Sequence, residues 1–396
     1  MNKSTDLSFI YFGNDWFAEN RTSSHHIARR LGSRFPLLYV ESPGLRAPQP
    51  SGRDLRKIFK KLCAVFRGPK QIGPCMWLMT VPQIPFRRFA TARKLNEVFA
   101  RWKLSRALRK LSLAPSISWF TVPHPGFLAG TLGEQMVVYY CIDNYAALPD
   151  VDAAEVAQMD GALSRRANLV FAASTGLVAA KQKQNGRVFY SPHAVDADLF
   201  GQAADSARPV AEGLRNLSHP VIGFFGVLDP RLDLSLIEYL AVQRPQWNLL
   251  LVGRVATDLG KLTDLPNLRA VGTVPYETLP DWARTFDLCI MPYRRDAFSE
   301  NANPLKLREY LATGRPVVSV PMPEVDRFGG HVAIADNKES FLAAIERELG
   351  SDSEVKRKAR LQLVSTDTWD ARVEQVVSIV REVLEEVTPS IQGMAN

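Results

Sequence analysis

Long hydrophobic runs are absent from this sequence of 396 residues. No apolar stretch approaches the roughly 20 residues of a membrane-spanning helix. The first residues also lack the basic head, apolar centre and cleavage site of a signal peptide. The cysteines show no close pairing, so we expect neither disulfides nor a zinc site; they are Cys63, Cys75, Cys141 and Cys289. These absences predict a cytoplasmic protein.

Two glycine-rich nucleotide-binding motifs are missing as well. The chain contains neither Gly-x-Gly-x-x-Gly nor Gly-x-x-x-x-Gly-Lys, which disfavours a nicotinamide enzyme or a P-loop ATPase. The stretch 150–152 has the Asp-x-Asp form that some metal-dependent transferases use, but it opens a predicted helix instead of ending a strand. Acids in a first helical turn are explained by the helix dipole alone, so we expect no metal and no resident cofactor.

The net charge of +8 is unevenly distributed, and acids are scarce in one segment. Between Arg46 and Lys110 there are 17 Lys or Arg residues against two acids, with apolar and aromatic residues interleaved. Such a basic 46–110 segment suits an anionic membrane surface at the inner face of the cell membrane. It also suits the solvated face of two basic helices. Nucleic acid is the third possibility, but no familiar nucleic-acid-binding motif is present, so we expect no such partner.

Short apolar strands alternate with helices twice along the chain, which predicts an α/β protein with two parallel, Rossmann-like sheets. The small, polar stretch 201–209 separates the two alternations. We therefore predict an N-terminal domain over 1–200, a C-terminal domain over 201–370, and a terminal helix and tail over 371–396. Strands are predicted at 7–12, 37–40, 76–79, 116–121, 136–140, 169–172, 188–190, 221–226, 247–252, 267–271, 288–291 and 317–320. Helices are predicted near 24–31, 53–66, 91–112, 151–165, 231–242, 277–285, 304–313, 338–348 and 369–387, and from Ser174. Ser23 or Ser24 is the expected N-cap of the first of these helices.

The stretch 303–320 reads as a loop, a short helix, a glycine stop and a buried strand. Pro304 suits the first helical position, and Gly314 suits the position just past the end. Lys306 lies in the first turn, where the helix dipole disfavours a cation unless a phosphate group docks there. Glu309, one turn further on, could then accept hydrogen bonds from hydroxyl groups. A solvated helix with an ordinary surface lysine and glutamate remains the alternative.

The stretch 304–318 resembles the nucleotide-sugar signature of GT-B glycosyltransferases of the family 4/family 1 group. The segments 191–196, 267–280 and 288–293 resemble other parts of that family in the right order. The first domain is similar, more narrowly, to teichuronic acid-type transferases and to the xanthan glucuronosyltransferase, through 24–27, 138–144 and the segment around His193.

This resemblance implies two Rossmann-like domains that face each other across a cleft, with the C-terminal helix crossing back to the first domain. It implies transfer of a sugar from a UDP-sugar co-substrate to a saccharide acceptor, often lipid-linked, in polysaccharide or glycolipid synthesis. Many retaining members carry a glutamate eight residues before the one that matches Glu309, but here that position is Asn301. The xanthan-type relatives also lack that glutamate, so we expect an inverting, metal-independent reaction.

The resemblance also assigns the donor side of the site. Lys306 and nearby backbone N–H groups would hold the phosphates, Glu309 the ribose, and the 274–276 loop the uracil. Tyr293 would reach the phosphates or, alternatively, only pack the end of its strand. The full set of expected donor-binding residues is Gly226, Val274, Pro275, Tyr293, Asn303, Pro304, Leu305, Lys306 and Glu309.

On the acceptor side, Asp143 matches the catalytic aspartate of the xanthan-type relatives and would deprotonate the acceptor hydroxyl. Its alternative role is a turn residue that hydrogen-bonds with Asn144. Asp15 is the second candidate for the base. Of His25 and His26, one is expected to order the acceptor site and the other to be an inactive surface residue. His193 is expected at a hinge.

Two other functions fit the same architecture. A UDP-sugar epimerase would convert its nucleotide sugar without an acceptor. A non-catalytic sugar-nucleotide-binding protein would bind without turnover. Neither needs a membrane surface, so the basic segment disfavours both.

Overall fold

A computed structural model describes residues 7–18, 21–42, 68–81, 90–148, 151–205, 207–211, 213–215 and 217–392. They form two compact units. Unit 1 contains the described chain up to Pro192, apart from Arg21, and takes up the chain again at Val373, whereas unit 2 runs from His193 to Arg372. The stretch 201–209, which we predicted to be the interdomain linker, begins in unit 2 with the last residue of α6 (Ala197–Gly201) and the turn η3 (Gln202–Ala204).

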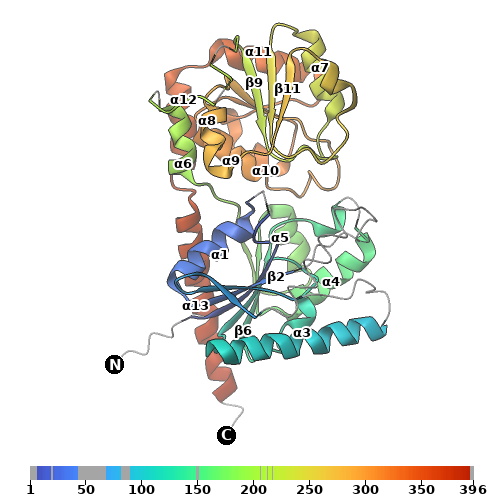
Figure 1. Ribbon diagram of the computed structural model, residues 1–396, viewed down its shortest axis with the longest axis vertical. Helices are drawn as coiled ribbons and strands as arrows, with labels where there is room; N and C mark the ends of the chain where they lie inside the picture. Colours follow the sequence, from blue (N-terminus) through green and yellow to red (C-terminus); the bar gives the residue numbers. More distant parts are fainter. Residues whose placement is uncertain are drawn as a thin grey trace. The chain divides into compact units, whose positions relative to one another are not determined.

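Figure 1 shows the sheet of unit 1, in which β2 and β6 are labelled. Among the described residues this sheet has eight strands, and only the edge strand β3 is antiparallel to its neighbour. The order across the sheet is β3 (Lys70–Gly73), β4 (Met76–Thr80), β2 (Leu37–Glu41), β1 (Phe9–Gly13), β5 (Ile117–Phe120), β6 (Met136–Cys141), β7 (Leu169–Ala172) and β8 (Val188–Tyr190). The strand order reverses between β1 and β5, so the carboxyl ends of these strands are where a ligand is expected.

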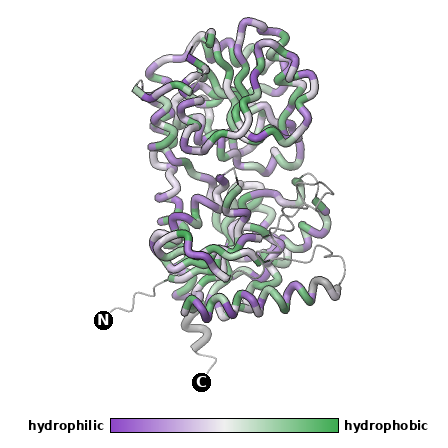
Figure 2. Tube along the Cα trace, in the orientation of Figure 1, coloured by the Kyte–Doolittle hydropathy of each residue, from purple (hydrophilic) through white to green (hydrophobic). Residues whose placement is uncertain are grey.

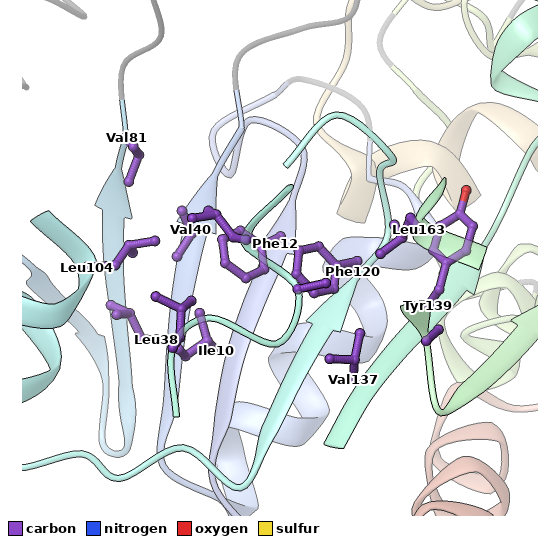
Figure 3. Packing of buried hydrophobic residues seen from close by; sticks show 14 of the residues in the cluster. Ile10, Phe12, Leu38, Val40, Val81, Leu104, Phe120, Val137, Tyr139 and Leu163 are labelled. Carbon is purple, nitrogen blue, oxygen red and sulfur yellow. The ribbon is translucent and has the colours of Figure 1, made fainter. Parts of the chain in front are cut away.

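The helices of unit 1 cover this sheet because their apolar faces pack on it. They are α1 (Ser23–Arg34), α3 (Ala90–Leu111), α4 (Ala153–Arg166), α5 (Thr175–Gln182) and α13 (Trp369–Gln392). Figure 3 shows one such contact, where Leu104 of α3 points toward Val81 and Leu38. From Val373 on, the C-terminal helix α13 is part of unit 1, as predicted, and its Glu374 pairs with Arg34 on α1.

Unit 2 has a six-stranded parallel sheet in the order β11 (Leu268–Gly272), β10 (Asn248–Val252), β9 (Val221–Phe225), β12 (Leu288–Met291), β13 (Val317–Ser319) and β14 (Ala333–Ile334). In chain order this is 3-2-1-4-5-6, the arrangement of a dinucleotide-binding Rossmann sheet, and it reverses between β9 and β12. Its helices are α6, α7 (Leu234–Gln243), α8 (Leu279–Ala283), α9 (Leu305–Ala312), α10 (Pro323–Asp326), α11 (Lys338–Ser351) and α12 (Glu354–Val364).

The predicted α/β class and the two Rossmann-like sheets are therefore confirmed. Along the strands the chain is mostly hydrophobic (Figure 2), as burial on both faces requires. Among the described strands and α-helices, five were not predicted: the exposed edge strand β3, the short β14, the short helices α6 and α10, and α12, whose buried side chains are only Arg360 and Val364. The predicted helix near 53–66 lies outside the described residues.

Candidate functional site

The helix α9 lies at the switch point of the unit 2 sheet. Pro304 is its N-cap and not its first helical residue, and no side chain caps its first N–H groups. Gly314 adopts a φ of 74° and ends the helix as predicted. The hydroxyl of Tyr310 accepts a hydrogen bond from Phe225 N at 3.0 Å, which fixes α9 against the carboxyl end of β9. The uncapped end of α9 therefore lies beside that strand end.

The stem of Lys306 runs over the backbone of Gly226, the residue that follows β9. Gly226 has a φ of 146°, and a Cβ placed on it would lie 1.8 Å from Lys306 Cε. The Lys306 Nζ lies 5.8 Å from the ring centroid of Phe224 and 5.9 Å from that of Tyr293. Among the described residues it forms no hydrogen bond or ion pair. A half-buried cation thus stands at a helix N-terminus without a carboxylate partner, which favours an anionic ligand.

Glu309 is buried one turn further along α9, with 5% of its surface exposed. The hydroxyl of Tyr276 donates a hydrogen bond to its Oε1 at 3.2 Å and lies 3.5 Å from Asp196 Oδ2. Burial raises the pKa of Glu309 to about 7, against the opposing effect of Lys306. Tyr276 therefore lies directly beside Glu309, whereas the predicted contact of the 274–276 loop with a base stays a prediction.

A second pair of charged residues near Lys306 escaped the sequence analysis. Arg231 donates to both carboxylate oxygens of Asp229, with Nη2 2.6 Å from Oδ2 and Nε 2.9 Å from Oδ1. Burial opposes ionisation of Asp229, but Arg231 and, more weakly, Lys306 outweigh it and lower the pKa of this carboxyl group. The signal in the sequence was the Asp-Pro-Arg turn soon after the end of a buried strand.

Asn303 is held by a buried network that was also missed. Arg308 Nη1 donates to Asn303 Oδ1 at 2.8 Å, and Asn303 Nδ2 lies 3.4 Å from Glu324 Oε2. Arg308 also pairs with Asp367, which in turn binds Arg372 at 2.8 Å. The amide of Asn303 thus fixes the loop that leads into α9, and its predicted contact with a ligand stays a prediction. Because Glu324, Asp367 and Arg372 come from distant parts of the chain, spacing alone gave no signal for this network.

In unit 1, Asp143 follows β6 at the carboxyl edge of the sheet and is half-buried. Its Oδ1 accepts a hydrogen bond from Asn144 N at 2.9 Å, so the proposed turn contact is present. This contact orients the carboxyl group without assigning it a chemical role. The neighbouring Tyr145 hydroxyl bonds to the carbonyl of Thr121, which follows β5, so the ends of the two strands are joined here.

The loop after β1 is tied to the start of α1 through His25. Thr22, and not Ser23 or Ser24, is the N-cap of α1, and Thr22 N donates to His25 Nδ1 at 3.1 Å. His25 Nε2 therefore carries the proton and donates to the carbonyl of Asp15 at 2.9 Å. The Asp15 side chain is exposed, and its Oδ1 caps a turn at Phe17 N.

Two expectations about histidines can be compared with the structure. His26 is 2% exposed and His25 is 1% exposed, so the prediction that one of them is a surface residue is wrong. Both lie on the buried face of α1 because this face packs on the sheet. His193 is buried at the first residue of unit 2, and burial together with Arg308 and Arg372 lowers its pKa to about 3. A histidine that stays neutral in this way is poorly suited to proton transfer near pH 7.

The acidic stretch 150–152 is described only in part. Asp152 is the N-cap of α4 and accepts a hydrogen bond from Glu155 N at 3.0 Å, the role that the helix dipole predicts. Across the described residues there is no cluster of three His, Cys, Asp or Glu side chains that could hold a metal ion. None of the helices within the described ranges is long and apolar enough to cross a membrane.

Two comparisons with known proteins found similarity at the level of sequence. Residues 219–351 match the family model "Glycosyl transferases group 1". A putative teichuronic acid biosynthesis glycosyltransferase of Bacillus subtilis is 27% identical over 310 residues, which cover 72% of this chain and 78% of the relative.

Solved structures show the same fold over nearly the whole chain. Sucrose-phosphate synthase of Thermosynechococcus elongatus has 14% identity and a TM-score of 0.69, covering 96% of this chain and 100% of its own. HepE of Anabaena, solved in complex with UDP and glucose, has 14% identity and a TM-score of 0.66, covering 95% of this chain and 99% of its own. At these identities the likeness concerns the fold alone.

Proposed function

We propose that this chain, a glycosyltransferase of the GT-B fold, transfers a sugar from a UDP-sugar to a saccharide acceptor. The observation that carries the proposal is the unpaired ammonium of Lys306 at the uncapped start of α9, one turn from the buried carboxyl group of Glu309. A nucleoside diphosphate carries an anionic diphosphate and a ribose diol on one molecule, so it offers a partner to each of these two side chains. The UDP complex of the structurally similar HepE supports the same assignment.

In glycosyl transfer, positive charge develops at the anomeric carbon and negative charge on the departing diphosphate. Lys306 and the first N–H groups of α9 supply positive charge where the diphosphate leaves. This charge supports departure of the nucleotide without a metal ion. Gly226 serves the reaction by letting the lysine stem cross the backbone at close range, and Tyr293 forms part of the wall beside the ammonium.

Glu309 in its ionised form accepts hydrogen bonds from the two ribose hydroxyls. Its burial makes ionisation costly, since its pKa lies near 7. The bound nucleotide offsets that cost in two ways: its hydroxyls donate to the carboxylate, and its base fills the space beside the 274–276 loop. We therefore expect donor binding and ionisation of Glu309 to strengthen each other.

Asp143 acts as the base that deprotonates the acceptor hydroxyl. The acceptor oxygen attacks the anomeric carbon directly while the bond to the diphosphate breaks, without a covalent bond between sugar and protein, so the reaction inverts the anomeric configuration. The support is the position of Asp143 at the end of β6 in unit 1, together with the turn contact that orients its carboxyl group. Asp15 is a weaker candidate, because its exposed carboxylate is used to cap a local turn.

The acceptor is lipid-linked, and the enzyme works at the inner face of the cell membrane in cell-surface polysaccharide synthesis. Two observations support this part of the proposal. One is the name of the Bacillus subtilis relative, which assigns it to teichuronic acid biosynthesis. The other is the basic 46–110 segment, whose charge suits an anionic membrane.

A test measures UDP release by the purified protein with a panel of UDP-sugars, with and without a lipid-linked saccharide acceptor. We expect release that depends on both substrates. Lys306→Met should weaken donor binding about 10- to 100-fold, the value of a charge-assisted hydrogen bond. Lys338→Met, at the first residue of α11, is the matched control and should leave donor binding unchanged. Conversion of a UDP-sugar without acceptor would indicate an epimerase, and binding without turnover a non-catalytic protein.

A further inference from the structure

The basic 46–110 segment contains one long described helix, α3, which has two opposite apolar faces. One face belongs to the core of unit 1: Ala100, Leu104 and Ala107 are at most 3% exposed. Lys103 lies on this inner side, where its Nζ donates to the carbonyl of Thr80 at 2.8 Å. Some of the apolar and basic residues that suggested binding to a membrane surface therefore belong to the core of unit 1.

The outer face of α3 consists of four apolar residues at helical spacing: Leu95, Val98, Phe99 and Trp102. Their exposed fractions are 60%, 61%, 37% and 57%. The spacing i, i+3, i+4 and i+7 places them in one stripe, and the rings of Phe99 and Trp102 lie 6.0 Å apart. Figure 2 shows the resulting alternation of hydrophobic and hydrophilic residues along α3. Four large apolar side chains left in water on one helix indicate a binding surface.

Cations surround this stripe. Lys94 and Arg101 are exposed beside it, and Arg106, Arg109 and Lys110 are exposed toward the end of the helix. The sole acid between Ala90 and Leu111 is Glu97. An apolar stripe with aromatic residues and a rim of Lys and Arg is the chemistry of a helix that lies in the interface of an anionic bilayer.

We propose that the outer face of α3 docks on the surface of an anionic membrane, with the helix axis parallel to the bilayer plane. The apolar stripe enters the boundary between headgroups and acyl chains, and the flanking cations contact lipid phosphates. This inference rests on the proposed function for its biological setting, but the docking itself requires neither the donor nor the acceptor.

Charge selects the membrane over other occupants. A second copy of this face would bring two sets of cations together, which opposes self-association. Nucleic acid would pair with the cations but would leave the central stripe of Leu95, Val98 and Trp102 without apolar partners. An anionic bilayer satisfies the apolar stripe and its cationic rim together.

The experiment is co-sedimentation of the full chain with acceptor-free vesicles of phosphatidylcholine alone or mixed with phosphatidylglycerol. We expect binding to the anionic vesicles only, weakened by added salt. Val98→Glu with Trp102→Glu, and separately Lys94→Glu with Arg101→Glu, should each lower the partition coefficient at least about tenfold. All four side chains are exposed, so the thermal midpoint should not change. Val355→Glu, at a 79% exposed position on α12, is the matched control and should bind normally.

Unchanged binding by both double variants would overturn the proposal, as would equal binding to neutral and anionic vesicles. A lipid-free dimer that Trp102→Glu dissociates would assign the face to a second copy instead, and capture of an RNA probe in preference to vesicles would assign it to nucleic acid. UDP release with a water-soluble acceptor is measured in parallel. It should persist in the Val98→Glu/Trp102→Glu variant, so that loss of docking is distinguished from failure of the proposed transferase activity.

Discussion

Replacing Glu309 by Gln should make the ligand-free protein more stable at neutral and alkaline pH while it impairs donor binding. Glu309 is buried, and its pKa rises from its ordinary 4.5 to about 7. In the unfolded chain the carboxyl group ionises at its ordinary pKa. Between these two pH values the folded state therefore holds more protons than the unfolded state, and stability falls as pH rises.

The size of this effect follows from the two pKa values. One pH unit of separation corresponds to about 1.4 kcal/mol, so ionised Glu309 should cost about 3 kcal/mol above pH 7, and nothing below pH 4.5. The glutamine side chain of the variant would carry no charge, and its carbonyl can still accept the hydrogen bond of Tyr276. The advantage of Glu309→Gln should therefore grow from near zero at pH 4.5 to about 3 kcal/mol at pH 8.

Urea denaturation of both proteins between pH 4.5 and 8.5, without nucleotide, measures this difference. UDP titration of the same samples should show much weaker binding by the Gln variant, because an amide accepts fewer hydrogen bonds from a diol than a carboxylate does. Two results would refute the assignment of Glu309 as a buried carboxyl group with a raised pKa. One is a stability difference that stays constant with pH, and the other is a wild-type protein that is more stable than the Gln variant at pH 8.

Three further substitutions test other parts of the site. Gly226→Ala should lower the affinity for UDP at least about tenfold, because the added methyl group displaces Lys306. Gly330→Ala, where a Cβ meets nothing within 4 Å, is the control and should leave the affinity unchanged. Titration with UDP measures both variants. Asp143→Asn should reduce turnover about 10²- to 10⁴-fold with an unchanged dissociation constant for UDP, and normal turnover would exclude it as the base. Arg308→Leu should destabilise the protein by about 2 to 3 kcal/mol in urea, since it leaves Asp367 with one cation fewer in a largely buried network; a smaller loss would mean that the pair is dispensable.

The fold could be predicted from the sequence because its strands are short, apolar and buried on both faces. Strands such as Leu169–Ala172 and Leu288–Met291 were predicted at the residues where they occur. The exceptions have a physical reason. β3 is an exposed edge strand that contains a lysine and a glycine, and α12 carries too few buried side chains to show a helical period. The N-cap of α1 was misplaced by one or two residues because Thr22, Ser23 and Ser24 are all acceptable caps.

The candidate site was predictable only where one short segment carries it. Lys306, Glu309 and Gly314 lie within one helix and its stop, so their spacing was informative. The pairing of Arg231 with Asp229, and of Arg308 with Asn303 and Asp367, depends on how the chain folds around the switch point. The burial of His26 likewise follows from the packing of α1 on its sheet, which the sequence around it does not reveal.

The central claim is that a nucleoside diphosphate binds at the start of α9. Hydrogen exchange of the backbone amides, measured with and without UDP, tests it most directly. The account predicts that UDP slows exchange at Leu305, Lys306 and Leu307 and in the segment after β9, and that Lys306→Met abolishes this protection. Protection confined to unit 1, or UDP binding that leaves the α9 amides unchanged, would contradict it.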